Sequence, residues 1–115
     1  MQIYGARKCA ITKKAERFFR DRGIAYHFVD LTQRALSKGE LENIRRGLEA
    51  GESLIDTESA AYKKRGMAYM VYDEAEELLA DPLLLRTPVL REGVRVIVGD
   101  DEKAWKALAA ELKGA

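Results

Sequence analysis

The only cysteine of the chain, Cys9, stands between a predicted strand and a predicted helix. Residues 1–4 have the character of a strand, and apolar residues recur at helical spacing after Ala10. A thiol at the N-terminus of a helix faces unpaired backbone N–H groups and the positive end of the helix dipole, which both favour the thiolate. We therefore predict that Cys9 is a reactive nucleophile. The alternative is a core cysteine that packs as a small hydrophobic residue.

Basic residues surround this cysteine. Residues 1–36 contain 8 basic and 3 acidic residues, a net charge of +5, whereas residues 37–85 contain 6 and 11, a net charge of −5. A basic surrounding favours an anionic ligand or an anionic thiol partner. The alternative is a helix face whose charges are simply solvated. The basic residues nearest to Cys9 are Arg7, Lys8, Lys13 and Lys14. We expect the first three to contribute to substrate binding.

The composition excludes several classes of protein. With 115 residues, 47% of them hydrophobic and 34% charged, the chain is expected to form one domain over residues 1–115. One cysteine cannot form an intramolecular disulfide, so a reducing, cytoplasmic location is expected, with no signal peptide. No apolar run is long enough to span a membrane. The near-zero net charge argues against direct nucleic-acid binding. No pair of His, Cys or acidic residues has the sequence spacing of metal ligands. We expect a monomer without a bound cofactor.

The first third of the chain predicts a βαβ unit. Its expected elements are a strand Met1–Tyr4 broken by Gly5, a helix Ala10–Arg22 capped by Gly23, and a strand Ala25–Asp30. Two strands joined by a helix imply a parallel pair with a right-handed crossover.

The middle of the chain, about residues 37–83, predicts a helical insertion. Helices are expected from Ser37 to Gly51, over residues 57–64 and over residues 73–80. Acidic residues dominate this part of the sequence.

The last third predicts a β-hairpin followed by a helix. The expected elements are a strand over 83–90, a turn at Glu92-Gly93, a strand over 94–98 and a helix over 101–112. We expect that helix to pack through Trp105, Leu108 and Leu112. The complete order is β-α-β, a helical insertion, then β-β-α, which is the order of an α/β thioredoxin-like fold with a four-stranded mixed sheet.

The chain resembles the ArsC-type arsenate reductase family, which includes the Spx and YffB-like branches. The resemblance covers nearly the whole chain and is closest to the YffB-like branch. The segments that support it are Ile3-Tyr4-Gly5 with Cys9, Lys13-Lys14-Ala15, Gly23-Ile24-Ala25-Tyr26 with Asp30, and Thr87-Pro88-Val89-Leu90 with Gly93.

The resemblance implies roles for three residues. Cys9 would be the nucleophile that attacks arsenate or exchanges with another thiol. Thr12 would donate a hydrogen bond to the thiolate, although it can also simply cap the first helical turn. Pro88 would follow a cis peptide bond beside the sulfur, next to Thr87, which would line the substrate site.

The chain also departs from the family at three arginines that hold the oxyanion. The corresponding positions have Asp56, Thr87 and Ile97. Arg86 lies one position too early for this role, so in an extended strand its side chain points to the opposite face. A shifted register would bring it into the substrate site.

The resemblance therefore implies a thiol oxidoreductase with one redox-active cysteine. Its substrate would be a small anion or a disulfide, and arsenate is the weaker candidate because the three arginines are absent. No second cysteine can resolve the adduct, so glutathione, a glutaredoxin or a thioredoxin would do so. The alternative is a non-catalytic Spx-like regulator that binds a partner such as RNA polymerase.

Overall fold

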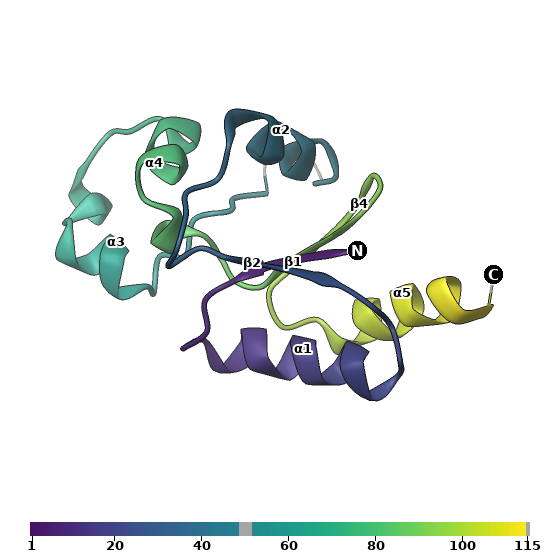
Figure 1. The fold of residues 1–115 in the computed structure, drawn as a ribbon. Helices are drawn as coiled ribbons and strands as arrows, with labels where there is room; N and C mark the ends of the chain where they lie inside the picture. Colours follow the sequence, from purple (N-terminus) through teal and green to yellow (C-terminus); the bar gives the residue numbers. More distant parts are fainter. Residues whose placement is uncertain (49–51, 115) are drawn as a thin grey trace.

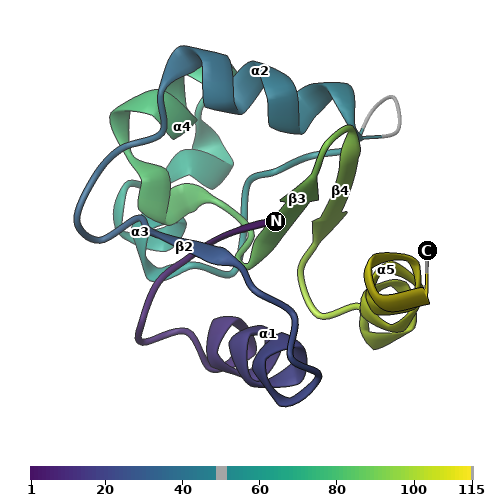
Figure 2. The same ribbon diagram turned by 45° about the vertical axis from the view of Figure 1, so that its right-hand side comes forward.

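The computed structural model describes residues 1–48 and 52–114, which form one four-stranded sheet with helices on both faces (Figures 1 and 2). The strand order is β2-β1-β3-β4. The β1 and β2 strands are parallel, whereas β3 is antiparallel to both β1 and β4. The strands are β1 (Gln2–Gly5), β2 (His27–Asp30), β3 (Val89–Glu92) and β4 (Arg95–Val98). The sheet is therefore the mixed sheet that the order of the predicted elements implies.

The helices divide between the two faces of this sheet. Figure 1 shows α1 and α5 on one face and α2 and α4 on the other. No helix among the described residues has the length and hydropathy that a membrane crossing requires. The α-helices are α1 (Ala10–Asp21), α2 (Lys38–Arg46), α3 (Ala60–Lys64), α4 (Glu74–Ala80) and α5 (Glu102–Gly114), and two 3₁₀ helices are η1 (Met67–Tyr69) and η2 (Pro82–Leu84).

The predicted βαβ unit is confirmed. The α1 helix ends at Asp21 with Arg22 as its C-cap, and the expected Gly23 follows with a φ of 69°, which allows the left-handed turn that closes the helix. The Gly23 N–H donates to the Arg20 carbonyl, and the Ile24 N–H donates to the Phe19 carbonyl. This is the Schellman arrangement, and it turns the chain back toward β2.

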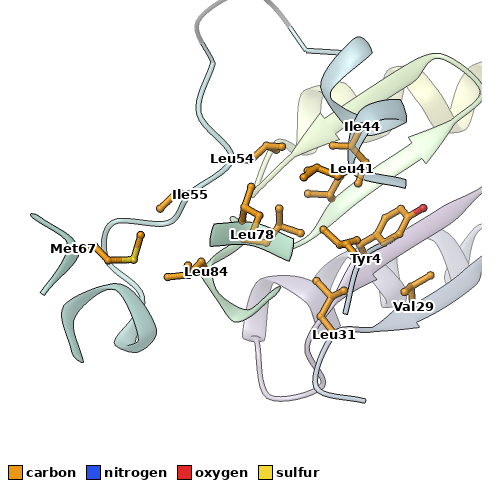
Figure 3. Packing of buried hydrophobic residues seen from close by; sticks show 13 residues of the cluster. Tyr4, Val29, Leu31, Leu41, Ile44, Leu54, Ile55, Met67, Leu78 and Leu84 are labelled. Carbon is orange, nitrogen blue, oxygen red and sulfur yellow. The ribbon is translucent and has the colours of Figure 1, made fainter. Parts of the chain in front are cut away.

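Two hydrophobic clusters hold the helices on the sheet. On the α2 and α4 face, Tyr4 and Val89 of the sheet pack against Leu41, Ile44 and Leu78 (Figure 3). The other cluster includes the fully buried Ile3, Phe19, Leu90, Trp105 and Leu108. Ile3 and Tyr4 belong to different clusters because consecutive strand residues point to opposite faces.

The capping box predicted at the start of α2 is confirmed, but this helix is shorter than expected. The Ser37 hydroxyl accepts from the Glu40 N–H, and the Glu40 carboxylate accepts from the Ser37 N–H. The helix ends at Arg46 with Gly47 as its C-cap, and Gly51 lies outside the described residues. An added Cβ at Gly47 would lie 2.7 Å from the Val94 carbonyl oxygen, so this end of α2 approaches the hairpin too closely for a side chain.

Two expected boundaries within the helical insertion are wrong. The α3 helix begins at Ala60 rather than near residue 57, because the Asp56 carboxylate accepts the Glu58 N–H and holds a turn. The strand expected from residue 83 begins only at Val89. Before it, the Asp81 carboxylate accepts the Leu83 N–H and starts η2.

Two further expectations need correction. Gly5 does not break β1 but is its last residue and pairs with Asp30. Leu112 is 37% exposed, and Ala109 instead joins Trp105 and Leu108 in the core. The predicted hairpin is confirmed, with Gly93 at a φ of 59° in its turn.

The network around Glu40 predicts a pH-dependent stability. The pKa of Glu40 is lowered to about 2. Hydrogen bonds from Arg34 lower it most and the Ser37 N–H also lowers it, whereas burial raises it. This stabilisation is complete above the unfolded pKa of about 4.5 and is lost as the pH falls toward about 2. Replacing Glu40→Gln should lower the free energy of unfolding by about 1–3 kcal/mol at pH 7. In urea titrations, the difference from the parent protein should shrink between pH 4.5 and pH 2.

Glu42 provides the matched control, because it is exposed on the same helix and has no ion pair with a described residue. Glu42→Gln should change the free energy of unfolding by at most about 0.5 kcal/mol at either pH. An equal loss in both variants would show that the Arg34–Glu40 pair has no special role.

Candidate functional site: the Cys9 thiol

Cys9 is the N-cap residue of α1, directly after the turn that leaves β1. Its N–H donates to the Ala6 carbonyl at 3.0 Å, and its own carbonyl accepts the first helical hydrogen bond from the Lys13 N–H at 3.1 Å. Cys9 is partly exposed. This position at a helix N-terminus is the one that the sequence predicted, and the partial exposure differs from that of a core cysteine.

Strand pairing brings Thr87 and Pro88 to this thiol. Tyr4 near the end of β1 pairs with Val89 at the start of β3, so the residues that precede Val89 lie beside the turn that carries Cys9. The Thr87-Pro88 peptide bond is cis, as the resemblance implied. The Thr87 hydroxyl donates to the Cys9 Sγ at 3.3 Å across 78 residues of sequence. Cys9 and Thr87 therefore form one site.

Thr12 is packed beneath this site. Its side chain is completely buried, and its hydroxyl has no partner with hydrogen-bonding geometry among the described residues. Space for Thr12 comes from Gly5, because a Cβ at Gly5 would lie 2.5 Å from the Thr12 Cγ2 and 2.6 Å from its Oγ1. Gly5 is therefore required for this packing.

The surroundings of Cys9 lower the pKa of its thiol. Partial burial acts in the opposite direction and raises the pKa, but hydrogen bonds from the Thr12 and Thr87 hydroxyls and from the backbone N–H groups of Thr12 and Ile11 outweigh it. The Thr87 hydroxyl makes its hydrogen bond to the sulfur in the structure, whereas the Thr12 hydroxyl makes none with a described residue. We therefore assign the firmer contribution to Thr87.

Removing the Thr87 hydroxyl should therefore raise the pKa of Cys9. Thr87→Val keeps the shape of the side chain but removes the donor to the sulfur. The pH dependence of the rate of alkylation by iodoacetamide reports the pKa directly, because only the thiolate reacts. Thr57→Val is the control, because Thr57 is exposed and makes no hydrogen bond to Cys9. Identical titrations of both variants would contradict a role for the Thr87 hydroxyl.

The basic residues near Cys9 have different surroundings. Lys8 and Lys13 are exposed and make no ion pair with the described residues, so both remain available to an anionic substrate. The Arg7 Nε lies 3.1 Å from the Asp30 Oδ2, and its guanidinium group lies over the Phe28 ring. Arg7 is thus directed toward β2.

Lys14 is occupied elsewhere. It pairs with Asp100 at 3.1 Å and with Glu102 at 2.7 Å, and so connects α1 to the start of α5.

Arg86 is held away from the sulfur. Its Nη1 donates to the Ser53 carbonyl at 2.9 Å and lies 3.9 Å from the Glu52 Oε1. It makes no hydrogen bond to Cys9 or Thr87. Asp56 is occupied in the turn before α3, and Ile97 is buried in the core on the α1 face. None of these positions contributes a cation that contacts Cys9.

Cys9 and Thr87 are both partly exposed, above the buried Thr12. Two surface hollows of about 330 and 370 Å³ lie elsewhere, one between residues 31–35 and 81–83 and the other at the C-terminal end of α1. Cys9, Thr12 and Thr87 line neither hollow. Within residues 1–48 and 52–114, His, Cys, Asp and Glu side chains do not gather in threes as a metal site requires.

Two features of the site were missed from the sequence. The first is that Thr87 contacts the sulfur itself, which its position before Pro88 could have indicated. The second is the dependence of Thr12 on Gly5. Gly5 lies two residues after Ile3, on the strand face that carries α1, and this spacing predicts a close approach to that helix.

Sequence comparisons identify proteins that are similar to this chain. The model of the ArsC family matches residues 4–108. The global transcriptional regulator Spx 2 of Oceanobacillus iheyensis is 32% identical over 106 residues, which cover 89% of this chain and 78% of that protein.

Solved structures have the same fold. The protein YffB has a TM-score of 0.78 and 27% identity, covering 92% of this chain and 96% of its own. An arsenate reductase from Vibrio cholerae has a TM-score of 0.76 at 17% identity, covering 93% and 97% of the two chains. The second likeness concerns the fold alone.

Proposed function

The chain belongs to the ArsC family, and from this we propose that it is a thiol oxidoreductase whose single nucleophile is Cys9. The observation that supports this most strongly is the contact of the Cys9 Sγ with the Thr87 hydroxyl, at the N-terminus of α1 and beside the cis Thr87-Pro88 bond. Cys9 is also partly exposed, as a residue that meets a substrate must be.

The proposed substrate is a mixed disulfide, such as a protein thiol joined to glutathione. The Cys9 thiolate attacks the glutathione sulfur, a new Cys9–glutathione disulfide forms, and the protein sulfur leaves as a thiolate. The hydroxyls of Thr87 and Thr12 stabilise the negative charge on Cys9 before the attack. Lys8 and Lys13 offer positive charge to the carboxylates of glutathione.

A second thiol completes the cycle. Because Cys9 is the only cysteine, an external thiolate must attack the Cys9–glutathione disulfide. With glutathione as reductant, the products are oxidised glutathione and the regenerated Cys9 thiolate. A glutaredoxin or a thioredoxin could supply the attacking thiol instead. With glutathione as reductant, each cycle consumes one mixed disulfide and one glutathione thiol and yields one protein thiol and one molecule of oxidised glutathione.

We propose a disulfide rather than arsenate because of the charges at the site. An oxyanion needs several fixed cations around the reacting atom. Asp56, Thr87 and Ile97 stand where the resemblance places arginines, and the Arg86 guanidinium is bound to Ser53. A disulfide carries no charge at its sulfur atoms and needs no such clamp.

The test is a turnover assay with two substrates in parallel. One reaction contains a glutathionylated peptide, the other contains arsenate, and each is tried with glutathione, a glutaredoxin and a thioredoxin as reductant. We expect turnover of the mixed disulfide and none of arsenate. Absence of turnover with all three reductants would refute the enzymatic function, and turnover of arsenate alone would refute the choice of substrate.

A second candidate function is that of a regulator that binds a partner without turnover. The observation that favours it is the 32% identity to a global transcriptional regulator. RNA polymerase is the partner to test first, with purified polymerase and this chain in a direct binding assay. Binding that is unchanged by Cys9→Ser, combined with no turnover, would favour this function over the first.

A further inference from the structure

The carboxylate of Glu74, the first residue of α4, holds the short segment 53–55 in place. Its Oε1 accepts from the Leu54 N–H at 2.6 Å, from the Ser53 hydroxyl at 2.9 Å and from the Ile55 N–H at 3.2 Å. Leu54 and Ile55 are buried in the core cluster that Figure 3 shows. Because a buried N–H without an acceptor is costly, the position of Glu74 determines the position of this segment.

The same segment pairs with the chain that leads to Thr87. The Arg86 N–H donates to the Leu54 carbonyl at 2.7 Å. The Asp56 N–H donates to the Leu84 carbonyl at 2.8 Å, and the residues between them form an antiparallel bridge. Thr87 directly follows Arg86, so this pairing fixes the backbone on the N-terminal side of Thr87.

Glu74 also determines where this pairing ends. Two residues that form a hydrogen-bonded antiparallel pair donate to each other through both N–H groups. Here the Arg86 N–H donates to the Leu54 carbonyl, but the Leu54 N–H donates to the Glu74 carboxylate instead. The chain after Arg86 therefore leaves the segment and turns into the cis Thr87-Pro88 bond.

Thr87 is held from its other side by the sheet. The Gly99 N–H donates to the Pro88 carbonyl at 2.8 Å, and β3 begins at the next residue. Between these two anchors, the Thr87 hydroxyl donates to the Cys9 Sγ at 3.3 Å. The sheet and segment 53–55 thus fix this donor on the sulfur together.

We propose that Glu74 is a positioning residue for Cys9, which holds segment 53–55 and so keeps the Thr87 hydroxyl within hydrogen-bonding distance of the sulfur. Glu74 acts through Thr87 and takes no part in the reaction itself. This role rests on the function proposed for Cys9, since a fixed donor matters only if the thiolate is used.

The sign of the effect separates this role from that of a nearby charge. Removing a negative charge near a thiol favours the thiolate and lowers the pKa of the thiol. Loss of the Thr87 donor has the opposite effect and raises the pKa of Cys9. A variant of Glu74 that raises this pKa therefore acts through position and not through charge.

The test is the pKa of Cys9 in variants of Glu74, measured by alkylation with iodoacetamide across the pH range. Glu74→Met offers no acceptor to the three donors and should raise the pKa. Glu74→Gln keeps a carbonyl oxygen as acceptor but loses the charge, so it should not raise the pKa. Glu74→Asp keeps the charge but is one methylene shorter, which draws the oxygen away from the donors. It should raise the pKa as well, and it takes the place of Glu74→Met if that variant does not fold.

Glu76→Met is the matched control, because Glu76 is exposed on the same helix and its carboxylate makes no hydrogen bond or ion pair with a described residue. It should leave the pKa of Cys9 unchanged. The double variant Glu74→Met/Thr87→Val should have the pKa of Thr87→Val alone, because both substitutions act through one hydroxyl.

An unchanged or lowered pKa in folded Glu74→Met, or in Glu74→Asp where the first variant does not fold, would overturn the proposal. Additive shifts in the double variant would do the same. These outcomes are independent of turnover. A parent protein that reduces no mixed disulfide would refute the enzymatic function, but it would leave the shift in the pKa of Cys9 as support for the role of Glu74.

Discussion

Replacing Cys9→Ser is expected to abolish reduction of a glutathionylated peptide, with a loss of at least about 10³-fold in turnover. Serine has nearly the shape of cysteine, but its hydroxyl is not ionised at neutral pH and forms no disulfide. No second cysteine can replace the lost nucleophile. The assay follows release of the free peptide thiol, with glutathione in excess.

Mass spectrometry supplies an independent readout for the same pair of proteins. After incubation with oxidised glutathione and no reductant, the parent protein should gain one glutathione and the variant none. Equal thermal unfolding of both proteins establishes that the fold is retained. Full turnover by the Cys9→Ser variant would refute the proposed role of this thiol.

The second large effect is expected at Gly5. Gly5→Ala should lower the free energy of unfolding by about 1–3 kcal/mol, because the new methyl group overlaps the Thr12 side chain at 2.5 Å. The displaced Thr12 should also no longer support the thiolate, so the pKa of Cys9 should rise. Urea unfolding measures the first effect and the pH dependence of alkylation measures the second.

Two further variants test whether steric overlap with Thr12 causes the loss of stability in Gly5→Ala. In Gly5→Ala/Thr12→Ala the two closest atoms, Thr12 Cγ2 and Oγ1, are gone, so the double variant should be more stable than Gly5→Ala by about 1 kcal/mol or more. Gly39→Ala lies in α2, where the added methyl group meets nothing within 4 Å, and it should stabilise the protein by about 0.5–1 kcal/mol. A loss of stability at Gly39 equal to that at Gly5 would contradict the packing explanation.

The sequence predicts the fold well because its signals are local. The spacing of apolar residues identifies α1, the capping box at Ser37 starts α2, and Gly93 marks the turn of the hairpin. The order of these elements then determines the thioredoxin-like sheet. The boundary at residue 83 could not be predicted in this way, since the apolar Leu83–Leu85 run fits a strand and a 3₁₀ turn equally. Asp81 decides between them through one hydrogen bond to the Leu83 N–H.

The candidate site is predicted less completely because it depends on contacts between distant residues. Cys9 is evident from its position before a helix. Its contact with Thr87 crosses 78 residues and requires the register of β1 against β3. Likewise, the sequence leaves open whether Arg86 reaches the sulfur, and only the position of the Ser53 carbonyl shows that its guanidinium is bound elsewhere.

The most direct test of a reactive thiolate is the pKa of Cys9 in the unmodified protein. Alkylation rates measured across the pH range report this one thiol without ambiguity, since the chain has no other cysteine. We expect a pKa below the value of about 8.5 for a free cysteine, because the hydroxyl and N–H donors outweigh the effect of burial. A pKa at or above that value would contradict the assignment of Cys9 as the nucleophile.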